Sequence, residues 1–146
     1  MKLNKYPSNI IYITFLLFFQ ILFSQNEPKE PINNNGIKAD YIDESYGDHK
    51  RNKFDIWIAE SEKPTPLVIY IHGGGFGSGD KSKFYKSKEL VKFLEKGISV
   101  ATINYRFQNH KPFGILASLK DSKRCLQFIR YNSNKYNIDK NKIGIY

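Results

Sequence analysis

Apolar residues recur along this chain in two patterns that predict strands. In residues 54–59 (FDIWIA) a phenylalanine and two isoleucines recur with a period of two, which is typical of a strand with one buried face. A shorter strand is predicted at residues 40–44, separated from the first by a Gly/Asp/His turn. Residues 67–71 (LVIYI) and 98–105 (ISVATINY) lack this alternation. Such continuous runs favour strands that are covered on both faces, as in a parallel sheet.

Two further segments have apolar residues at helical spacing, residues 83–96 and residues 115–132. The apolar positions are Leu90, Val91 and Leu94 in the first segment, and Leu116, Leu119, Leu126 and Ile129 in the second. Gly97 is well placed to end the first helix. Residues 137–141 predict a turn, and residues 142–146 predict the beginning of one more strand.

The predicted elements follow one another as strand, strand, strand, helix, strand, helix, strand. Strands that alternate with helices through right-handed crossovers form a layered α/β domain. We therefore expect a mainly parallel sheet flanked by helices over residues 39–146. Ten tyrosines, eleven phenylalanines and a hydrophobic content of 40% supply the apolar area for its core.

The first 25 residues predict a signal peptide. Lys2 and Lys5 precede an apolar run of fourteen residues at 10–23, and polar residues follow it. This run is shorter than the roughly 20 residues that span a bilayer comfortably. We expect export to the periplasm or the medium, with no stable membrane span after cleavage; an N-terminal membrane anchor is the alternative. Residues 26–38, polar and with two prolines, predict a flexible leader.

Charge and cysteine content exclude some classes of partner. The formal net charge is +9. Much of the excess comes from lysines in residues 81–96, which we assign to a solvated helix face rather than a nucleic-acid surface. The single cysteine, Cys125, lies in a helical apolar pattern and predicts a buried thiol without a disulfide. We expect no nucleic-acid partner and no cofactor.

Five glycines stand in residues 73–79, directly after a buried-type strand, in the stretch IYIHGGGFGSGDKS (69–82). A phosphate loop would need its lysine where Asp80 stands, and a dinucleotide fingerprint would need glycine at Ser78 or Asp80. An oxyanion hole instead uses bare backbone N–H groups to hold the negative charge of acyl transfer. The spacing favours the oxyanion hole; a glycine-rich loop without a ligand is the alternative.

The sequence HGGGF at residues 72–76 resembles the HGGG motif of α/β-hydrolase-fold lipases and esterases. The similarity continues, in order, through GSGDKS (77–82), INYRF (103–107), Pro112-Phe113, Asp121 and YNIDKNKIGIY (136–146). It is strongest to secreted esterases, a group that includes feruloyl and acetyl-xylan esterases. The resemblance implies that Gly74 and Gly75 are oxyanion donors, while Gly73 and His72 shape and orient the turn.

Three charged residues are expected to support this site without reacting. Arg106, at the end of a strand, and Asp121, in the helix that follows, are predicted to form an ion pair. Asp80 is predicted to cap a turn or the start of a helix, with a local pairing to Lys81 as a further possibility.

The nucleophile motif G-x-S-x-G occurs nowhere in the 146 residues. The resemblance places it directly after residue 146, and places the acid and histidine of the triad later still. We therefore expect the N-terminal part of an α/β-hydrolase fold, truncated at its fifth strand, from a carboxylic ester hydrolase. Its substrate would be a small-molecule or carbohydrate-linked ester, and the chain alone would be inactive. Alternatives are a non-catalytic remnant or binding protein, or a serine peptidase of the same fold.

Overall fold

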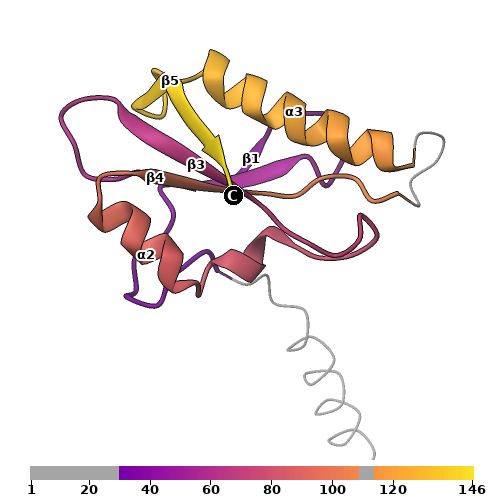
Figure 1. The fold of residues 1–146 in the computed structure, drawn as a ribbon, viewed down its shortest axis with the longest axis horizontal. Helices are drawn as coiled ribbons and strands as arrows, with labels where there is room; N and C mark the ends of the chain where they lie inside the picture. Colours follow the sequence, from indigo (N-terminus) through magenta and orange to yellow (C-terminus); the bar gives the residue numbers. More distant parts are fainter. Residues whose placement is uncertain (1–29, 109–113) are drawn as a thin grey trace, which may run out of the picture.

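The computed structural model describes residues 30–108 and 114–146 (Figure 1). Its strands are β1 (Tyr41–Ser45), β2 (Lys53–Trp57), β3 (Thr65–Ile71), β4 (Ser99–Ile103) and β5 (Ile138–Ile145). Its helices are the 3₁₀ turn η1 (Lys81–Phe84), α2 (Lys88–Glu95) and α3 (Ile115–Tyr131). The expected signal peptide at residues 1–25, the beginning of the leader and the Pro112-Phe113 pair lie outside the described residues.

The strands form one mixed sheet in the order β1-β2-β4-β3-β5. As predicted, β3 is parallel to its neighbours β4 and β5, and the helices α2 and α3 make the two crossovers. The pairings of β2 with β1 and with β4 are antiparallel, so the sheet is less uniformly parallel than the sequence pattern predicts. The β1–β2 pairing is antiparallel because a short turn joins these two strands, and such a turn does not connect parallel neighbours.

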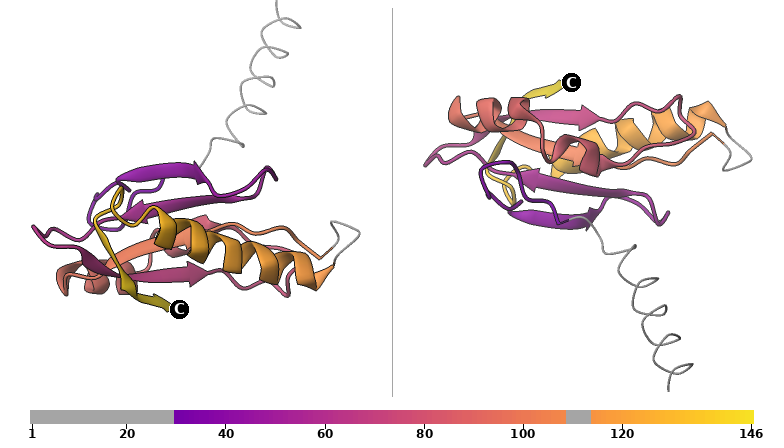
Figure 2. Two further views of the ribbon diagram at one scale, coloured as in Figure 1. Left: turned by 90° about the horizontal axis from the view of Figure 1, so that it is seen from above. Right: turned by 90° about the horizontal axis from the view of Figure 1, so that it is seen from below.

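The two helices cover opposite faces of the sheet (Figures 1 and 2). Cys125 and Ile129 of α3 pack in one apolar cluster with Ala101 of β4, whereas Leu90 of α2 packs in a second cluster with Val100. Neighbouring residues of β4 thus point to opposite clusters, and all five residues of this strand are buried. A strand covered on both faces is the arrangement that the unbroken apolar run predicts.

The buried side of α3 matches the prediction only in the second half of the helix, where Ile129 is buried and Leu126 packs partly buried against the same cluster. Leu116 and Leu119 are exposed, and the residues that face the sheet include Ala117, Asp121 and Cys125, which follow one another at intervals of four. The helix is turned in this way because Asp121 is buried in an ion pair with the end of β4. The spacing of apolar residues along the helix does not reveal that contact.

Two segment boundaries also differ from the prediction. The first helical segment is divided into η1 and α2, and the Ser87 side chain accepts a hydrogen bond from the N–H of Glu89 at the start of α2. The turn predicted at residues 137–141 is wrong beyond Asn137, which has a positive φ of 50°. Residues 138–141 belong to β5, whose pairing with β3 is irregular between Thr65 and Leu67.

Residues 30–38, the described part of the expected leader, pack on the domain. Ile32 and Lys38 form a bridge, and the indole N–H of Trp57 donates to the carbonyl of Ile37 at 3.2 Å. Asn33 is buried. This part therefore follows the surface of the sheet instead of extending away from it. Within the described ranges, no helix is long and apolar enough to cross a membrane.

Candidate functional site

The glycine-rich loop, residues 72–80, leaves the carboxyl end of β3 and leads into η1. The carboxyl end of β5 lies beside it, because the N–H of Ile71 donates to the carbonyl of Tyr146 at 3.1 Å. Figure 1 shows this end of β5 at the carboxyl edge of the sheet. Ligands of α/β sheets bind outside the carboxyl ends of the strands. The loop therefore occupies the edge where a ligand is expected.

The loop is folded back on the carbonyl of Gly74. This oxygen accepts hydrogen bonds from the N–H groups of Gly77 and Ser78, each at 3.1 Å. Gly74 has a φ of +135°, and a Cβ there would lie 2.1 Å from the Ser78 carbonyl oxygen. At this position glycine is required by the turn of the loop itself, in addition to any requirement imposed by a substrate.

Gly73 and Gly75 border open space. A Cβ built on either residue meets no atom within 4 Å. Among the residues that the structure describes, none accepts a hydrogen bond from the backbone N–H of Gly73, Gly74 or Gly75. Backbone donors without a partner, beside free space, can bind an anionic oxygen.

His72 is held by the backbone and by an aromatic ring. Its Nδ1 lies 3.0 Å from the carbonyl oxygen of Gly73, and its ring stacks on that of Tyr105 at 4.4 Å between centroids. The hydroxyl of Tyr105 donates to the His72 carbonyl at 2.7 Å. Burial, and secondarily the charge of Arg51, lowers the pKa of His72, so the ring is neutral at physiological pH. A neutral, enclosed imidazole of this kind has the contacts that an orienting residue requires.

Asp80 caps η1. One carboxylate oxygen accepts the N–H of Ser82 at 2.9 Å, and the other accepts the Asn104 amide at 2.8 Å. Burial raises the pKa of Asp80, but these hydrogen bonds outweigh it and keep the pKa below its usual value. The predicted cap is confirmed. The predicted pairing with Lys81 is wrong, because the Lys81 ammonium is buried and contacts Asp43 and Asp55 instead.

The predicted ion pair between Arg106 and Asp121 is confirmed. The guanidinium donates twice to the carboxylate, at 2.7 Å from Nη2 and 2.9 Å from Nε. The backbone N–H of Arg106 and the amide of Asn52 donate to the same carboxylate at 3.0 and 2.8 Å. Asp121 therefore ties the end of β4 and the helix α3 to the turn between β1 and β2.

The Asp121 contacts predict a loss of stability in acid. Burial raises the pKa of this carboxyl, but the hydrogen bonds from Arg106 and Asn52 outweigh it, so the pKa in the folded chain lies below the ordinary 3.8. The resulting stabilisation is complete well above pH 3.8 and is lost as the pH falls through the folded-state pKa. In urea titrations, Asp121→Asn should therefore be less stable than the parent chain near neutral pH, and the difference should shrink in acid. A constant difference would contradict this assignment.

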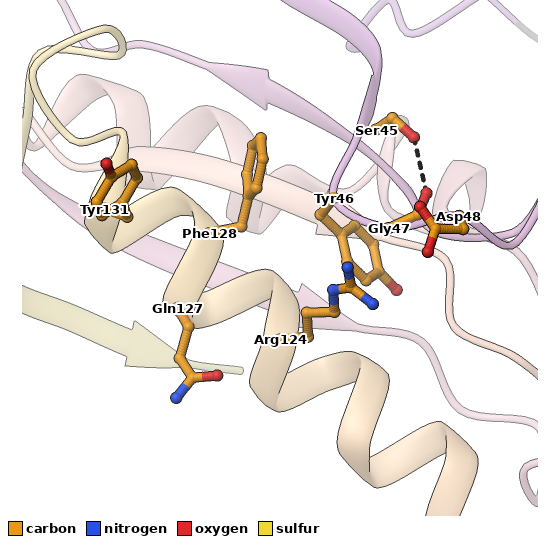
Figure 3. A pocket seen from close by; sticks show the side chains of 8 residues that line it. All are labelled: Ser45, Tyr46, Gly47, Asp48, Arg124, Gln127, Phe128 and Tyr131. Carbon is orange, nitrogen blue, oxygen red and sulfur yellow. Dashed lines mark hydrogen bonds between the residues drawn. The ribbon is translucent and has the colours of Figure 1, made fainter.

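A hollow is also present away from the glycine-rich loop. It has a volume of about 520 Å³ and lies between α3 and the turn after β1 (Figure 3). Its lining residues are Ser45, Tyr46, Gly47, Asp48, Arg124, Gln127, Phe128 and Tyr131. None of these belongs to the glycine-rich loop, so this hollow is separate from the candidate oxyanion site. The described residues hold no group of histidine, cysteine and carboxylate side chains suited to a metal ion.

Comparison with known proteins identifies the family. The BD-FAE family model matches residues 54–146, from β2 to the end of β5. The chain belongs to the BD-FAE family. Carboxylesterases are among the relatives of this α/β-hydrolase chain, in agreement with the resemblance seen in the glycine-rich motif.

Individual relatives of this BD-FAE chain are esterases. A probable isoprenylcysteine alpha-carbonyl methylesterase of Oryza sativa subsp. japonica is 31% identical over 100 residues, covering 67% of this chain and 23% of that protein. The juvenile hormone esterase of Tribolium castaneum is 29% identical over 97 residues, covering 60% of this chain and 16% of that protein. The chain therefore spans less than a quarter of the length of these relatives.

Solved structures share the fold. A bifunctional GH43-CE protein of Bacteroides eggerthii superposes with a TM-score of 0.64 at 30% identity, over 72% of this chain and 15% of that one. An acetyl ester-xyloside bifunctional hydrolase of Caldicellulosiruptor lactoaceticus gives a TM-score of 0.54 at 33% identity, over 64% of this chain and 32% of that one. The observed mixed sheet with flanking helices agrees with these neighbours.

Two polar residues at the loop of this BD-FAE chain were not found from the sequence. The Asn104 side chain accepts from the N–H of Lys81 at 2.8 Å and from Arg51 at 3.2 Å. Its amide at the end of an apolar run was an available signal, because a buried polar side chain needs partners. Arg51 stands in a polar turn, and nothing in its local sequence distinguishes it from a solvated residue.

Proposed function

We propose that this BD-FAE chain forms the oxyanion-hole part of a serine carboxylic ester hydrolase whose nucleophile is supplied by residues beyond 146. The observation that carries the proposal is the set of backbone N–H groups at Gly73, Gly74 and Gly75 that have no acceptor among the described residues, with open space beside Gly73 and Gly75. The carboxyl end of β5 reaches the same edge of the sheet, at Tyr146. A residue that follows β5 would therefore emerge next to these donors.

The proposed reaction uses the loop in both halves of acyl transfer. A serine hydroxyl attacks the ester carbonyl and gives its proton to a base that is supplied, like the serine, by residues beyond 146. The carbonyl oxygen takes the negative charge as the tetrahedral intermediate forms, and the base returns the proton to the departing alcohol. The glycine N–H groups stabilise this charge, and each such donor contributes about 3 kcal/mol in the transition state. Collapse of the intermediate expels the alcohol, and water then releases the acid from the acyl-enzyme by the same route. His72 orients the loop and transfers no proton.

For the substrate we propose an ester carried by a carbohydrate. Support comes from the two solved structures at 30% identity or more, whose names describe a GH43-CE protein and an acetyl ester-xyloside hydrolase. A small apolar ester is the second candidate, favoured by the methylesterase and juvenile hormone esterase relatives. Export through residues 1–25, which would bring the protein to extracellular polysaccharide, remains part of the proposal.

The test compares two forms of the protein. The 146-residue chain should not turn over p-nitrophenyl acetate, whereas the product of a reading frame that continues past Tyr146 into G-x-S-x-G should do so. Acetate release from acetylated xylan, measured beside hydrolysis of p-nitrophenyl butyrate, separates the two substrate classes. Turnover by the 146-residue chain above that of its Gly74→Ala variant would overturn the assignment of the nucleophile. A stop codon directly after Tyr146 would favour the non-catalytic remnant.

A further inference from the structure

We propose that Arg51 is a positioning residue for the glycine-rich loop. It holds the two ends of the loop together and fixes His72 as the neutral Nδ1–H tautomer. Arg51 lies in the turn between β1 and β2, well before the loop in sequence. Its effect on catalysis rests on the proposed function above. Its effect on the loop and on His72 is a property of this chain alone and is measurable without any substrate.

Arg51 first holds the end of the loop. Its Nη2 donates to the carbonyl of Gly79 at 3.0 Å, and its Nε donates to the carbonyl of Tyr105 at 2.9 Å. The same Nη2 lies 3.2 Å from the Asn104 side-chain oxygen. One guanidinium thus connects the last glycine of the loop to the backbone that follows β4.

Arg51 also reaches the beginning of the loop. Its Nη2 lies 3.4 Å from Nε2 of His72. The two ends of the loop touch at this point, because a Cβ on Gly79 would lie 2.5 Å both from Nδ1 of His72 and from the carbonyl oxygen of Gly73. The guanidinium therefore spans a junction at which His72 and Gly79 are already in contact.

The hydrogen bonds of His72 determine its tautomer. The carbonyl of Gly73 can only accept, so Nδ1 carries the proton. In the neutral ring this leaves a lone pair on Nε2, which faces Arg51, a side chain that can only donate. A second proton, on Nε2, would make the imidazole a cation. Its Nε2–H would then face the Arg51 guanidinium, which is also a donor and also positively charged. The charged groups around the ring are Arg51, Lys83 and Asp80, with the phenol of Tyr105 stacked on its face.

The site suits arginine in particular. The guanidinium carbon lies 3.8 Å from the centroid of the Phe107 ring, so the planar group stacks on an aromatic face while its edge reaches several acceptors. A lysine at this position would carry the charge but could not stack and bond in the same fork geometry. The loss of Arg51 would leave the Gly79 carbonyl without this donor and free Nε2 of His72 to bind a proton.

The deciding measurement is the titration of His72 by nuclear magnetic resonance. In the ¹⁵N-labelled 146-residue chain, long-range proton–nitrogen spectra should show the Nδ1–H tautomer near neutral pH and a His72 pKa below the ordinary 6.5. In Arg51→Gln the His72 pKa should be higher than in the parent chain and closer to 6.5. Arg124→Gln, at an exposed arginine of α3, is the matched control and should behave as the parent chain.

The outcomes separate this proposal from the proposed function. An Nε2–H tautomer in the parent chain would overturn the role of Arg51, as would a His72 titration in Arg51→Gln identical to that of Arg124→Gln. The first of these readouts needs no variant, so a failure of Arg51→Gln to fold does not remove the test. In a catalytically complete form, Arg51→Gln should lower kcat by roughly 10- to 100-fold with little change in KM, and Arg51→Lys should restore part of it. Absence of esterase activity in that form would refute the proposed function and leave the His72 result standing.

Discussion

Replacing Asp55 with alanine is expected to lower the free energy of unfolding by about 3–5 kcal/mol, because it leaves a buried ammonium group without its main partner. Asp55 is fully buried in β2, and one of its oxygens lies 2.5 Å from Nζ of Lys81. The hydroxyl of Tyr85 donates to that same oxygen, and the N–H of Asp43 donates to the other at 2.8 Å. After the substitution, Lys81 would keep the neutral hydroxyl of Tyr85 and, as its one remaining charged partner among the described residues, the exposed carboxylate of Asp43.

A double variant identifies the cause of this loss. Truncating Lys81 to methionine together with Asp55→Ala removes the charge as well as its partner, so the double variant should be more stable than Asp55→Ala alone. Urea unfolding followed by far-ultraviolet circular dichroism measures both, and Glu62→Ala, at an exposed residue between β2 and β3, serves as the control. A double variant as unstable as the single one would assign the loss to the cavity instead of the unpaired lysine.

The ion pair between Lys81 and Asp55 also anchors the glycine-rich loop. Lys81 directly follows the Asp80 cap, and its own N–H donates to Asn104 at 2.8 Å. The ion pair with Asp55 therefore anchors the backbone at the point where the loop enters η1. A charged residue that would ordinarily be assigned to a solvated surface instead fixes one end of the candidate site.

The features that could be predicted from the sequence are those with a local cause. β4 lacks alternation because both of its faces are covered, whereas β3 is buried on one face and half-buried on the other; the pattern is visible in five to seven consecutive residues. The glycines after β3 are similarly recognisable, since the Gly74 turn closes on Ser78, four residues later. The ion pair between Arg106 and Asp121 is predicted from a charged residue at the end of a strand and an opposite charge in the helix that follows, and the structure supplies its geometry.

The features that were missed depend on residues far apart in the sequence. Lys81 was assigned to a solvated helix face because its neighbours are polar, whereas its partner Asp55 lies 26 positions earlier. Arg51 reaches acceptors between 21 and 54 positions away. No periodicity within a window of one helix or strand contains these pairs. The same limit applies to the first half of α3, where Asp121 is buried and Leu116 and Leu119 are exposed.

Gly74→Ala is expected to lower kcat for ester hydrolysis by roughly 100- to 1,000-fold in a catalytically complete form of the protein. The added Cβ would lie 2.1 Å from the carbonyl oxygen of Ser78, at a φ of +135° that side chains rarely adopt. The backbone must therefore move, and the N–H groups at this turn would no longer point at the oxyanion. Donors that stabilise only the transition state affect kcat, so KM should change little.

Gly73→Ala tests the open space beside these donors without moving the donors themselves. A Cβ on Gly73 meets nothing within 4 Å, so the loop can keep its shape while a methyl group enters the region proposed for the acyl group. This variant should hydrolyse p-nitrophenyl acetate nearly as well as the parent but lose activity toward longer acyl chains. Gly144→Ala, where a Cβ also meets nothing, is the control on β5. A Gly74→Ala variant that stays folded and retains kcat would show that the negative charge is stabilised elsewhere, because the added Cβ must displace the backbone that carries the proposed donors.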